Sequence, residues 1–483
     1  MKPGQPEIVP GCLKMKNLFL SLVALFIAST LASAQTGVFK AGAFAQDISP
    51  EDLPISINGN MKDGKATMVH DRIHARCIVL DDGITKLALV VCDSCMIPRE
   101  VFDAAKKTVA EKIGIPATNI LCSATHTHSA PTSTGVFQSE PEKDYPAFLS
   151  KKISLGIIEA HNRMVPAQIG WGVGSDPTQV FNRRWFIKPG MMNTNPFGET
   201  SDKVIMNPGY QNARVEKSAG PTDPEVSILS LKTKEGKHIA LLANYSLHYV
   251  GGYPAISADY FGAFAEQIGI LLDADRSFVG IMSNGTSGDV NNVNFAGMPP
   301  GRREPGEQIR VVASSVAKAA HKALGNIKYK NHVSLASEQK EIPLGVRLPS
   351  KADLERATDI LTKANKTVLD TMPEIYARET VLLSKFPPQV PAIIQVMRIG
   401  ELGICAIPCE VFTDIGLEIK RKSPLKPTFT ISLANGYNGY LPTPEHHKLG
   451  GYETWRARSS YLETEASVKI TSTLMGLLEK VKK

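Results

Sequence analysis

The 483-residue sequence lacks several features that mark specialised classes of protein. It has no polybasic block, and its net charge of +7 is modest for this length, so nucleic acid is not an expected partner. It has no internal repeat and no low-complexity linker, so the chain is not an array of repeated units. Beyond its N-terminal segment, no stretch is apolar enough to span a bilayer.

What remains is the composition of a large soluble globular protein. Hydrophobic residues make up 43% of the chain and charged residues 21%. A chain of this size and composition can bury a large core, as one big domain or two ordinary ones.

The N-terminus has the organisation of a secretory signal peptide. Starting at Met15, a short basic start is followed by an apolar stretch from Leu18 to Ala28 and by small residues ending at Ala34. This order predicts cleavage after Ala34. The alternative, a single transmembrane anchor, is disfavoured because the apolar stretch is too short. We therefore expect a leader and signal peptide over residues 1–34 and an exported domain over residues 35–483, secreted or periplasmic.

Six cysteines follow the expected cleavage site, and their pairing cannot be read from sequence. Cys92 and Cys95 have the spacing of a redox or zinc motif. They lie, however, where a buried strand runs into a loop, and no second pair follows at zinc-ribbon spacing. Packing in the core is the favoured role for both.

Strand-like and helical patterns alternate along the chain and predict a mixed α/β (α+β) fold, with sheets covered by helices in one large catalytic domain. Expected strands lie at 87–93, 120–124, 167–172, 226–231, 239–247, 278–284, 392–399, 403–408 and 428–435. Expected helices are Arg99 to Ile113, Pro146 to Met164, Gly306 to Leu324, Lys351 to Thr371 and Glu463 to Val481.

Two segments between these elements are candidates for substrate-facing loops. Residues 186–225 are long and rich in Gly, Pro and Asn, and a long loop in a compact domain is often functional. The alternative for this segment is an idle surface insertion. Residues 297–307 form a second candidate rim loop.

The stretch CSATHTHSAP, residues 122 to 131, places His126 and His128 two positions apart directly after an apolar strand. Residues i and i+2 of extended chain point the same way, so both imidazoles can face one cleft. Strand ends are where α/β proteins tend to bind ligands. Taken alone, a His-x-His pair is a weak indication of a metal site.

Three further apolar strands deliver polar groups in the same manner. In ANYSLHYVGG the apolar strand is followed by His248, and in ICAIPCEVFTDIG it is followed by Glu410. In LANGYNGYLPTP it is followed by asparagine, glycine and tyrosines. Each residue alone has an ordinary explanation as a cap or a satisfied core group. Together, metal-competent imidazole, carboxylate and tyrosine groups at four strand ends favour a metal site, and zinc prefers imidazole nitrogen with carboxylate or another oxygen donor.

These blocks resemble the neutral and alkaline, non-lysosomal ceramidases, zinc-dependent amidases that split ceramide into sphingosine and a fatty acid. The blocks ATHTHSAP, FNRRW, GDVNN, IPCEVFT and NGYNGYLPTPEHHKLGGYE match the family's own. The resemblance runs from about Val38 to Tyr461 and covers the family's N-terminal catalytic domain. We expect no counterpart of the family's C-terminal immunoglobulin-like domain in this sequence.

The resemblance implies a specific set of site residues. The family's zinc ligands correspond to His126, His248, Glu410 and Tyr440. Its substrate-holding pair corresponds to His128 and Arg183. Two imidazoles, a carboxylate and a phenolic oxygen form a donor set that suits zinc, in agreement with the strand-end pattern.

One block departs from the family pattern. The family carries a serine in G-D-V-S-P-N, whereas this chain has GDVNNV, with Asn291 at that position. Asparagine can only donate and accept hydrogen bonds, so we expect Asn291 to orient the substrate or a water molecule. Zinc chemistry does not depend on this serine. Asp289 is expected to support a zinc ligand.

The sequence therefore predicts an exported zinc-dependent amidohydrolase in which an activated water attacks the carbonyl of an N-acylated substrate. The expected partner is a small-molecule or lipid N-acyl compound; peripheral membrane contact and the oligomeric state stay open. The alternatives are a zinc esterase or lactonase, and a secreted binding protein that keeps the zinc pocket without catalysis. For His446 and His447, contact with the substrate at the rim or proton transfer stands beside an ordinary place on the polar surface as an equal alternative. His70 and His74 are expected in a loop and on a strand surface, and the alternative for them is a second metal site.

Overall fold

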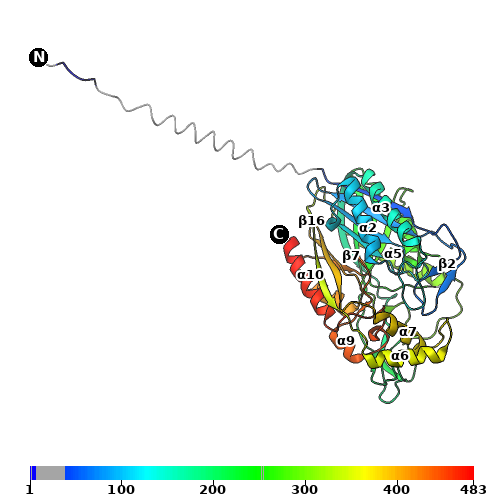
Figure 1. The fold of residues 1–483 in the computed structure, drawn as a ribbon. Helices are drawn as coiled ribbons and strands as arrows, with labels where there is room; N and C mark the ends of the chain where they lie inside the picture. The colour runs from blue at the N-terminus through cyan, green and yellow to red at the C-terminus, as the bar shows by residue number, and fades with distance from the viewer. Residues whose placement is uncertain (2, 7–37, 252, 254, 483) are drawn as a thin grey trace.

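The computed structural model describes residues 1, 3–6, 38–251, 253 and 255–482, and the expected signal peptide lies outside these residues (Figure 1). Its larger sheet mixes parallel and antiparallel neighbours. The strand order is β14 (Val279–Asn284), β13 (His238–Tyr245), β12 (Glu225–Thr233), β7 (Val165–Ser175), β1 (Lys40–Asp47), β4 (His74–Asp81), β5 (Lys86–Cys92) and β6 (Ile120–Ala124).

A smaller sheet packs face to face on the larger one. Its order is β16 (Leu335–Gly345), β17 (Gln389–Ile399), β18 (Leu402–Ala406) and β20 (Thr428–Ile431). Strand residues alternate between the two faces of a sheet. Leu229 and Leu231 of β12 therefore join Met397 and Phe429 in the apolar layer between the sheets, whereas Ile228 points to the other side.

Helices cover the outer faces of both sheets and complete an α/β/β/α arrangement. On the larger sheet lie α2 (Arg99–Ile113), α3 (Tyr145–Asn162), α4 (Asp259–Leu271) and α5 (Glu307–Leu324). On the smaller sheet lie α8 (Thr413–Lys422) and α10 (Ala466–Lys482), and Figure 1 shows α10 on the flank opposite α3. This confirms the expected mixed α/β fold. No helix among the described residues is both long and apolar enough to cross a membrane.

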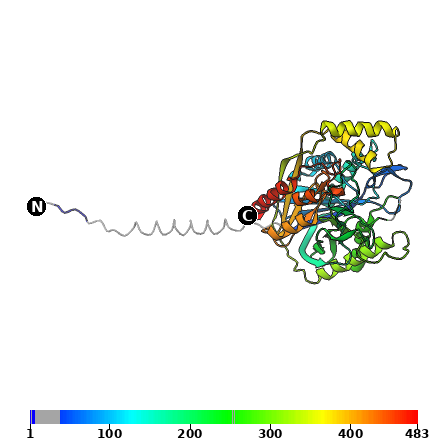
Figure 2. The same cartoon turned by 90° about the horizontal axis from the view of Figure 1, so that it is seen from below.

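The expected helix from Lys351 to Thr371 is too long. The structure has α6 (Lys351–Ala364) and then a separate α7 (Met372–Leu383). Asn365 ends α6 with a φ of 46°, in the left-handed region that asparagine tolerates better than most residues. Thr371 begins α7 as its N-cap, with a capping box to Glu374. Figure 2 shows α6, in yellow, at the periphery and away from the two sheets.

The expected long loop at 186–225 is mostly irregular chain, as predicted, but it also carries short strands. It contains β10 (Val204–Met206) and β11 (Val215–Ser218), which pair with the two edges of β9 (Arg184–Ile187). Backbone hydrogen bonds join these short strands, and β9 begins directly after Arg183. The glycine- and asparagine-rich composition reflects the turns between these strands.

The six cysteines of the described residues are buried free thiols. Cys92 and Cys95 both belong to the apolar cluster under α2 and α3, which confirms the packing role. Cys95 has a second neighbour, because its Sγ lies 3.8 Å from Nδ1 of His126.

Short strands pair with one another beyond the ends of the long strands. β8 (Phe181–Asn182) pairs with β15 (Val290–Asn291), and β19 (Glu410–Val411) pairs with β21 (Tyr440–Leu441). The hairpin of β2 (Ile55–Ile57) and β3 (Gly64–Ala66) lies beside the segment that carries His128, through a bridge between Ile57 and Pro131.

Candidate metal centre

Backbone hydrogen bonds at the strand ends bring the four expected metal-binding positions together. After β6, the amide of His126 donates to the carbonyl of Ser94 (2.8 Å), which joins the ends of β6 and β5. After β13 comes His248, beside the turn that follows β14. Glu410 and Tyr440 are direct neighbours in the parallel pair of β19 and β21.

His126 has a backbone conformation that few residues other than glycine adopt. Its φ is 80°, in the left-handed region, and its side chain is only 2% exposed. Such strain persists where the surroundings fix it, and it is concentrated at functional sites. Here the strain turns the imidazole so that Nδ1 donates to the carbonyl of Cys95 at 2.8 Å.

His248 is oriented in the same way. Its Nδ1 donates to the carbonyl of Ser287 at 3.1 Å. When Nδ1 of a neutral imidazole carries the proton, Nε2 keeps its lone pair. The Nε2 atoms of His126 and His248 lie 3.2 Å apart, so two lone pairs face one another.

Glu410 adds a third electron-pair donor to the same point. Its Oε2 is buried without a hydrogen bond and lies 3.2 Å from Nε2 of His126. Two lone pairs and a carboxylate oxygen repel one another unless a cation lies among them. His126, His248 and Glu410 form a group of metal-competent atoms within 4.8 Å of one another. This donor set fits zinc, whose ligands include imidazole nitrogen and carboxylate oxygen.

The ionisation of these groups is consistent with a site for positive charge. Burial lowers the pKa of His126, but the Glu410 carboxylate and the Cys95 thiol outweigh it and raise that pKa well above 6.5. Burial and Arg183 hold the pKa of His248 well below 6.5. A proton on Nε2 of His126, beside the Glu410 carboxylate, would thus stand where a metal ion would bind.

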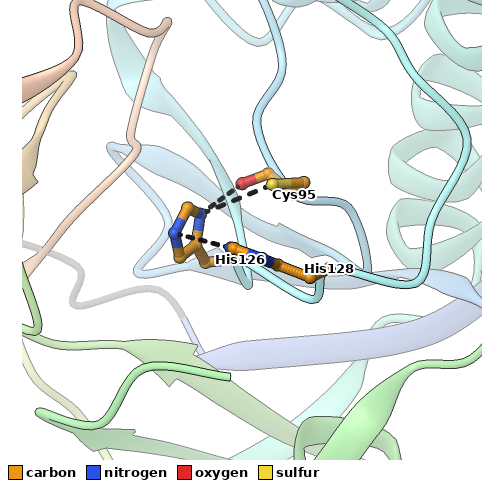
Figure 3. A group of neighbouring side chains, drawn as sticks. All are labelled: Cys95, His126 and His128. Atoms are coloured by element: carbon orange, nitrogen blue, oxygen red, sulfur yellow. Dashed lines mark hydrogen bonds between the residues drawn. The ribbon is translucent and has the colours of Figure 1, made fainter. Parts of the chain in front are cut away.

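A second metal-competent group shares His126 with Cys95 and His128 (Figure 3). Its sulfur lies on the Nδ1 side of His126, where the ring already donates to the Cys95 carbonyl. Burial is the main cause that raises the pKa of the Cys95 thiol, so the thiolate that a metal needs is disfavoured. The group with His248 and Glu410 is therefore the better metal site.

His128 lies beside the metal-binding group rather than within it. Its Nε2 is 3.3 Å from Nε2 of His126, and its ring stacks on Tyr249. Burial, followed by His126 and Arg183, holds the pKa of His128 well below 6.5. The ring is therefore neutral at pH 7 and can donate one hydrogen bond.

Arg183 is 4% exposed, and protein atoms use most of its hydrogen-bonding capacity. Nε donates to Glu453 (3.0 Å), and Nη2 donates to the Gly288 carbonyl (2.9 Å) and to the Tyr440 hydroxyl (3.1 Å). Nη1 lies 3.2 Å from Nε2 of His248. Arg183 thus links two candidate metal-binding residues and keeps about one free N–H for a substrate.

The structure adds residues that the sequence did not single out. Tyr437 donates its hydroxyl hydrogen to Oε1 of Glu410 (3.1 Å), and Glu453 holds Arg183 while being fully buried. Both lie in the block from residue 435 to 453, so that block was the available signal. Tyr249 follows His248 directly, and Cys95 is visible in the sequence only as part of a Cys-x-x-Cys pair.

Asn291 is not part of this cluster of contacts. Its Nδ2 donates to Asn207 (2.8 Å), and its Oδ1 accepts from the Val293 amide (2.9 Å). Among the described residues, the Asp289 side chain has no hydrogen bond to His126, His248, Glu410 or Tyr440. Its carboxylate accepts from Thr413 and Asn182, while its carbonyl accepts the amide of Arg183.

His446 and His70 contact neighbours outside the group of His126, His248 and Glu410. Nδ1 of His446 contacts the Thr443 hydroxyl at 2.7 Å inside the first turn of α9 (Pro444–Leu449). Nε2 of His446 lies 3.4 Å from Asp414. His70 stacks on Tyr253 with ring centroids 3.7 Å apart, in a loop as expected.

Comparison with solved structures matches the whole arrangement rather than a single motif. The chain is similar to a neutral ceramidase from Pseudomonas aeruginosa, with a TM-score of 0.69 and 17% identity, over 92% of this chain and 74% of that one. It is also similar to a ceramidase complexed with C2, with a TM-score of 0.66 and 16% identity, over 92% of this chain and 75% of the other. No family model matches the sequence. The chain thus has the neutral ceramidase fold, and its expected resemblance is confirmed at the level of the fold.

Proposed function

We propose that this chain is an exported zinc-dependent amidohydrolase that cleaves the amide bond of an N-acylated substrate, with ceramide-like lipids as the first class to test. One observation carries the proposal. Nε2 of His126, Nε2 of His248 and the unpartnered Oε2 of Glu410 converge on one buried point. The fold shared with neutral ceramidases supports the same reading.

The metal would be held by His126, His248 and Glu410, with the Tyr440 hydroxyl as a fourth oxygen donor. Bound there, zinc would lower the pKa of a water molecule and polarise the substrate carbonyl. The protein contributes fixed orientation, since carbonyls of Cys95 and Ser287 hold both imidazoles in the tautomer that presents Nε2. Burial excludes bulk water and strengthens each electrostatic contact in the site.

His128 is the residue placed to stabilise developing negative charge on the substrate oxygen. Neutral His128 has one N–H, and its Nε2 is directed toward the metal-binding group. A single donor of this kind typically contributes about 10²–10³ in rate. Arg183 keeps the Tyr440 hydroxyl in place and offers its remaining N–H to a substrate acceptor.

Asn291 has a peripheral role in this scheme. One N–H of its amide binds Asn207 and one lone pair accepts the Val293 amide, so its second N–H is left to orient the substrate or a water molecule, and it carries out no proton transfer. Hydrolysis by this arrangement needs no side-chain nucleophile, so the asparagine at this position is compatible with turnover.

The test is to incubate the purified, zinc-loaded mature chain with labelled ceramide, shorter N-acyl amides, and matched esters and lactones. Glu410→Ala serves as the metal-site control. Release of fatty acid from an amide by the wild type but not by Glu410→Ala is the expected result. Cleavage of esters or lactones alone would replace the amidase by an esterase or lactonase. Zinc binding without any turnover would favour a binding protein.

A further inference from the structure

The His128 ring lies between an aromatic ring and a glycine turn. On one face, its centroid is 3.6 Å from that of Tyr249, with an angle of 14° between the ring planes. Against its Nδ1 edge lies Gly59, with a φ of 112°. A Cβ at Gly59 would stand 2.3 Å from Cγ and Nδ1 of His128, so only glycine permits this approach.

His128 differs from its two neighbours in how its ring is oriented. Nδ1 of His126 and Nδ1 of His248 each contact a backbone carbonyl, whereas Nδ1 of His128 is buried without a well-aligned hydrogen bond and has only the backbone of Gly59 beside it. Catalytic imidazoles are usually held by a hydrogen bond at the nitrogen that does not react. For His128, packing must supply much of this constraint.

Both contacts of the ring are themselves anchored. The amides of Val250 and Gly251, which follow Tyr249, donate to the carboxylate of Asp259 at 3.1 and 2.7 Å. Asp259 is 3% exposed and takes a positive φ of 57°, so the surrounding structure fixes it. On the other side, Asn58 donates through Nδ2 to the carbonyl of Thr134 at 3.2 Å.

We propose that Tyr249 is a positioning residue: together with the Gly59 turn it holds the His128 ring so that Nε2 faces the metal-binding group. This inference rests on the proposed hydrolytic function. Misplacing a donor by about 1 Å costs on the order of 10²-fold in rate. The stacking surface, rather than the Tyr249 hydroxyl, is the part that matters.

The kinetic test compares Tyr249→Leu with Tyr249→Phe in the zinc-loaded mature chain. Tyr249→Leu is expected to lower kcat about 10- to 100-fold with a much smaller change in KM and unchanged zinc content. Tyr249→Phe keeps the stacked ring and is expected to retain kcat. The matched control is Tyr253→Leu, because Tyr253 stacks on His70 in the same part of the chain but outside the site.

A second readout does not depend on turnover. In metal-free, histidine-labelled protein, the ring of Tyr249 should shift the carbon-bound protons of His128 upfield in the NMR spectrum. The shift is expected in the wild type and in Tyr249→Phe, and it should disappear in Tyr249→Leu but not in Tyr253→Leu.

The two readouts separate the possible failures. Wild-type kcat in Tyr249→Leu, or unshifted His128 resonances in the wild type, would overturn the positioning role. If the wild type cleaves no substrate, the hydrolytic proposal fails, and the NMR comparison alone decides whether Tyr249 holds the ring.

Discussion

At the scale of single residues, His126, His248 and Glu410, the candidate metal-binding side chains, each have a neighbour that fixes their orientation. Carbonyls of Cys95 and Ser287 do this for the two imidazoles. Tyr437 does it for Glu410, by donating to Oε1 and leaving Oε2 directed at the histidines. Such neighbours tune metal affinity although they do not touch the metal.

Tyr437→Phe should therefore weaken zinc binding about 10- to 100-fold, because Oε1 of Glu410 loses the hydroxyl that orients the carboxylate. Competition with a chromophoric chelator measures the affinity. Tyr461→Phe is the matched control, since the Tyr461 hydroxyl also donates to a buried oxygen, that of Asn438, away from the histidines. Equal zinc affinity in Tyr437→Phe and the wild type would show that Glu410 does not rely on this contact.

The residues that the sequence revealed and those it missed differ in a physical respect. His126, His248 and Glu410 are polar side chains at the ends of apolar strands, so the local pattern exposes them. Tyr249 and Glu453 act through contacts with residues far along the chain, and tyrosine or glutamate at such positions has many ordinary uses. The contact of Arg183 with Glu453 joins residues 270 positions apart.

At the scale of elements, the backbone of the turn after β14 packs in direct contact with the backbone of β19. The amide of Gly288 donates to the carbonyl of Val411 at 2.8 Å, and its carbonyl accepts from Arg183. A Cβ at Gly288 would lie 2.6 Å from the carbonyl oxygen of Glu410. This close approach of two backbones is what places Glu410 beside Arg183 and His248.

Gly288→Ala should consequently push β19 away from the turn. Overpacking of this kind costs about 1–3 kcal/mol of unfolding free energy, and the displaced Glu410 should bind zinc more weakly. Chemical denaturation and zinc titration measure the two effects. Gly301→Ala is the control, because a Cβ there meets no atom within 4 Å. A Gly288→Ala protein with the stability and zinc affinity of the wild type would mean that this contact is not tight.

Helices and strands could be predicted where hydrophobic periodicity was strong. They could not be predicted where capping residues determine where a helix begins or ends. The range Arg99–Ile113 and the strand at 120–124 match the structure. The helix beginning at Lys351 was extended too far because Asn365 can adopt a left-handed conformation without any signal in the hydrophobic pattern. The segment at 186–225 was taken as a loop because its strands are only three or four residues long.

At the scale of the whole molecule, the layers bury titratable groups that carry no charge in the folded state. His447 is half-buried, and burial, followed by Arg347 and Arg184, lowers its pKa from 6.5 to about 3. In the unfolded chain its pKa returns to about 6.5. Between these values the unfolded state binds more protons than the folded state.

Stability should therefore be at its full value above pH 6.5 with respect to His447 and fall as the pH is lowered from 6.5 toward 3. Thermal unfolding between pH 7.5 and pH 5 measures the loss. His447→Gln cannot be protonated, so its melting temperature should decline less on acidification than that of the wild type. An identical acid dependence in both proteins would show that His447 is not held neutral by the fold.

The pairing of the two sheets is the part of the architecture that the sequence could not show. Alternation within β12 indicates which residues share a face, but not that Leu229 meets Met397 of another sheet. That choice is made by the packing of the complete core. The convergence of four strand ends at one site follows from it, which is why the pattern could indicate zinc without giving its geometry.

In the proposed site, a metal ion is held by His126, His248 and Glu410 and not by Cys95. X-ray absorption at the zinc edge of the zinc-loaded protein distinguishes these two arrangements. The expected spectrum has two imidazole ligands and only nitrogen or oxygen neighbours at about 2.0–2.2 Å. A sulfur neighbour at about 2.3 Å would contradict the claim and assign the metal to the group of Cys95, His126 and His128 instead.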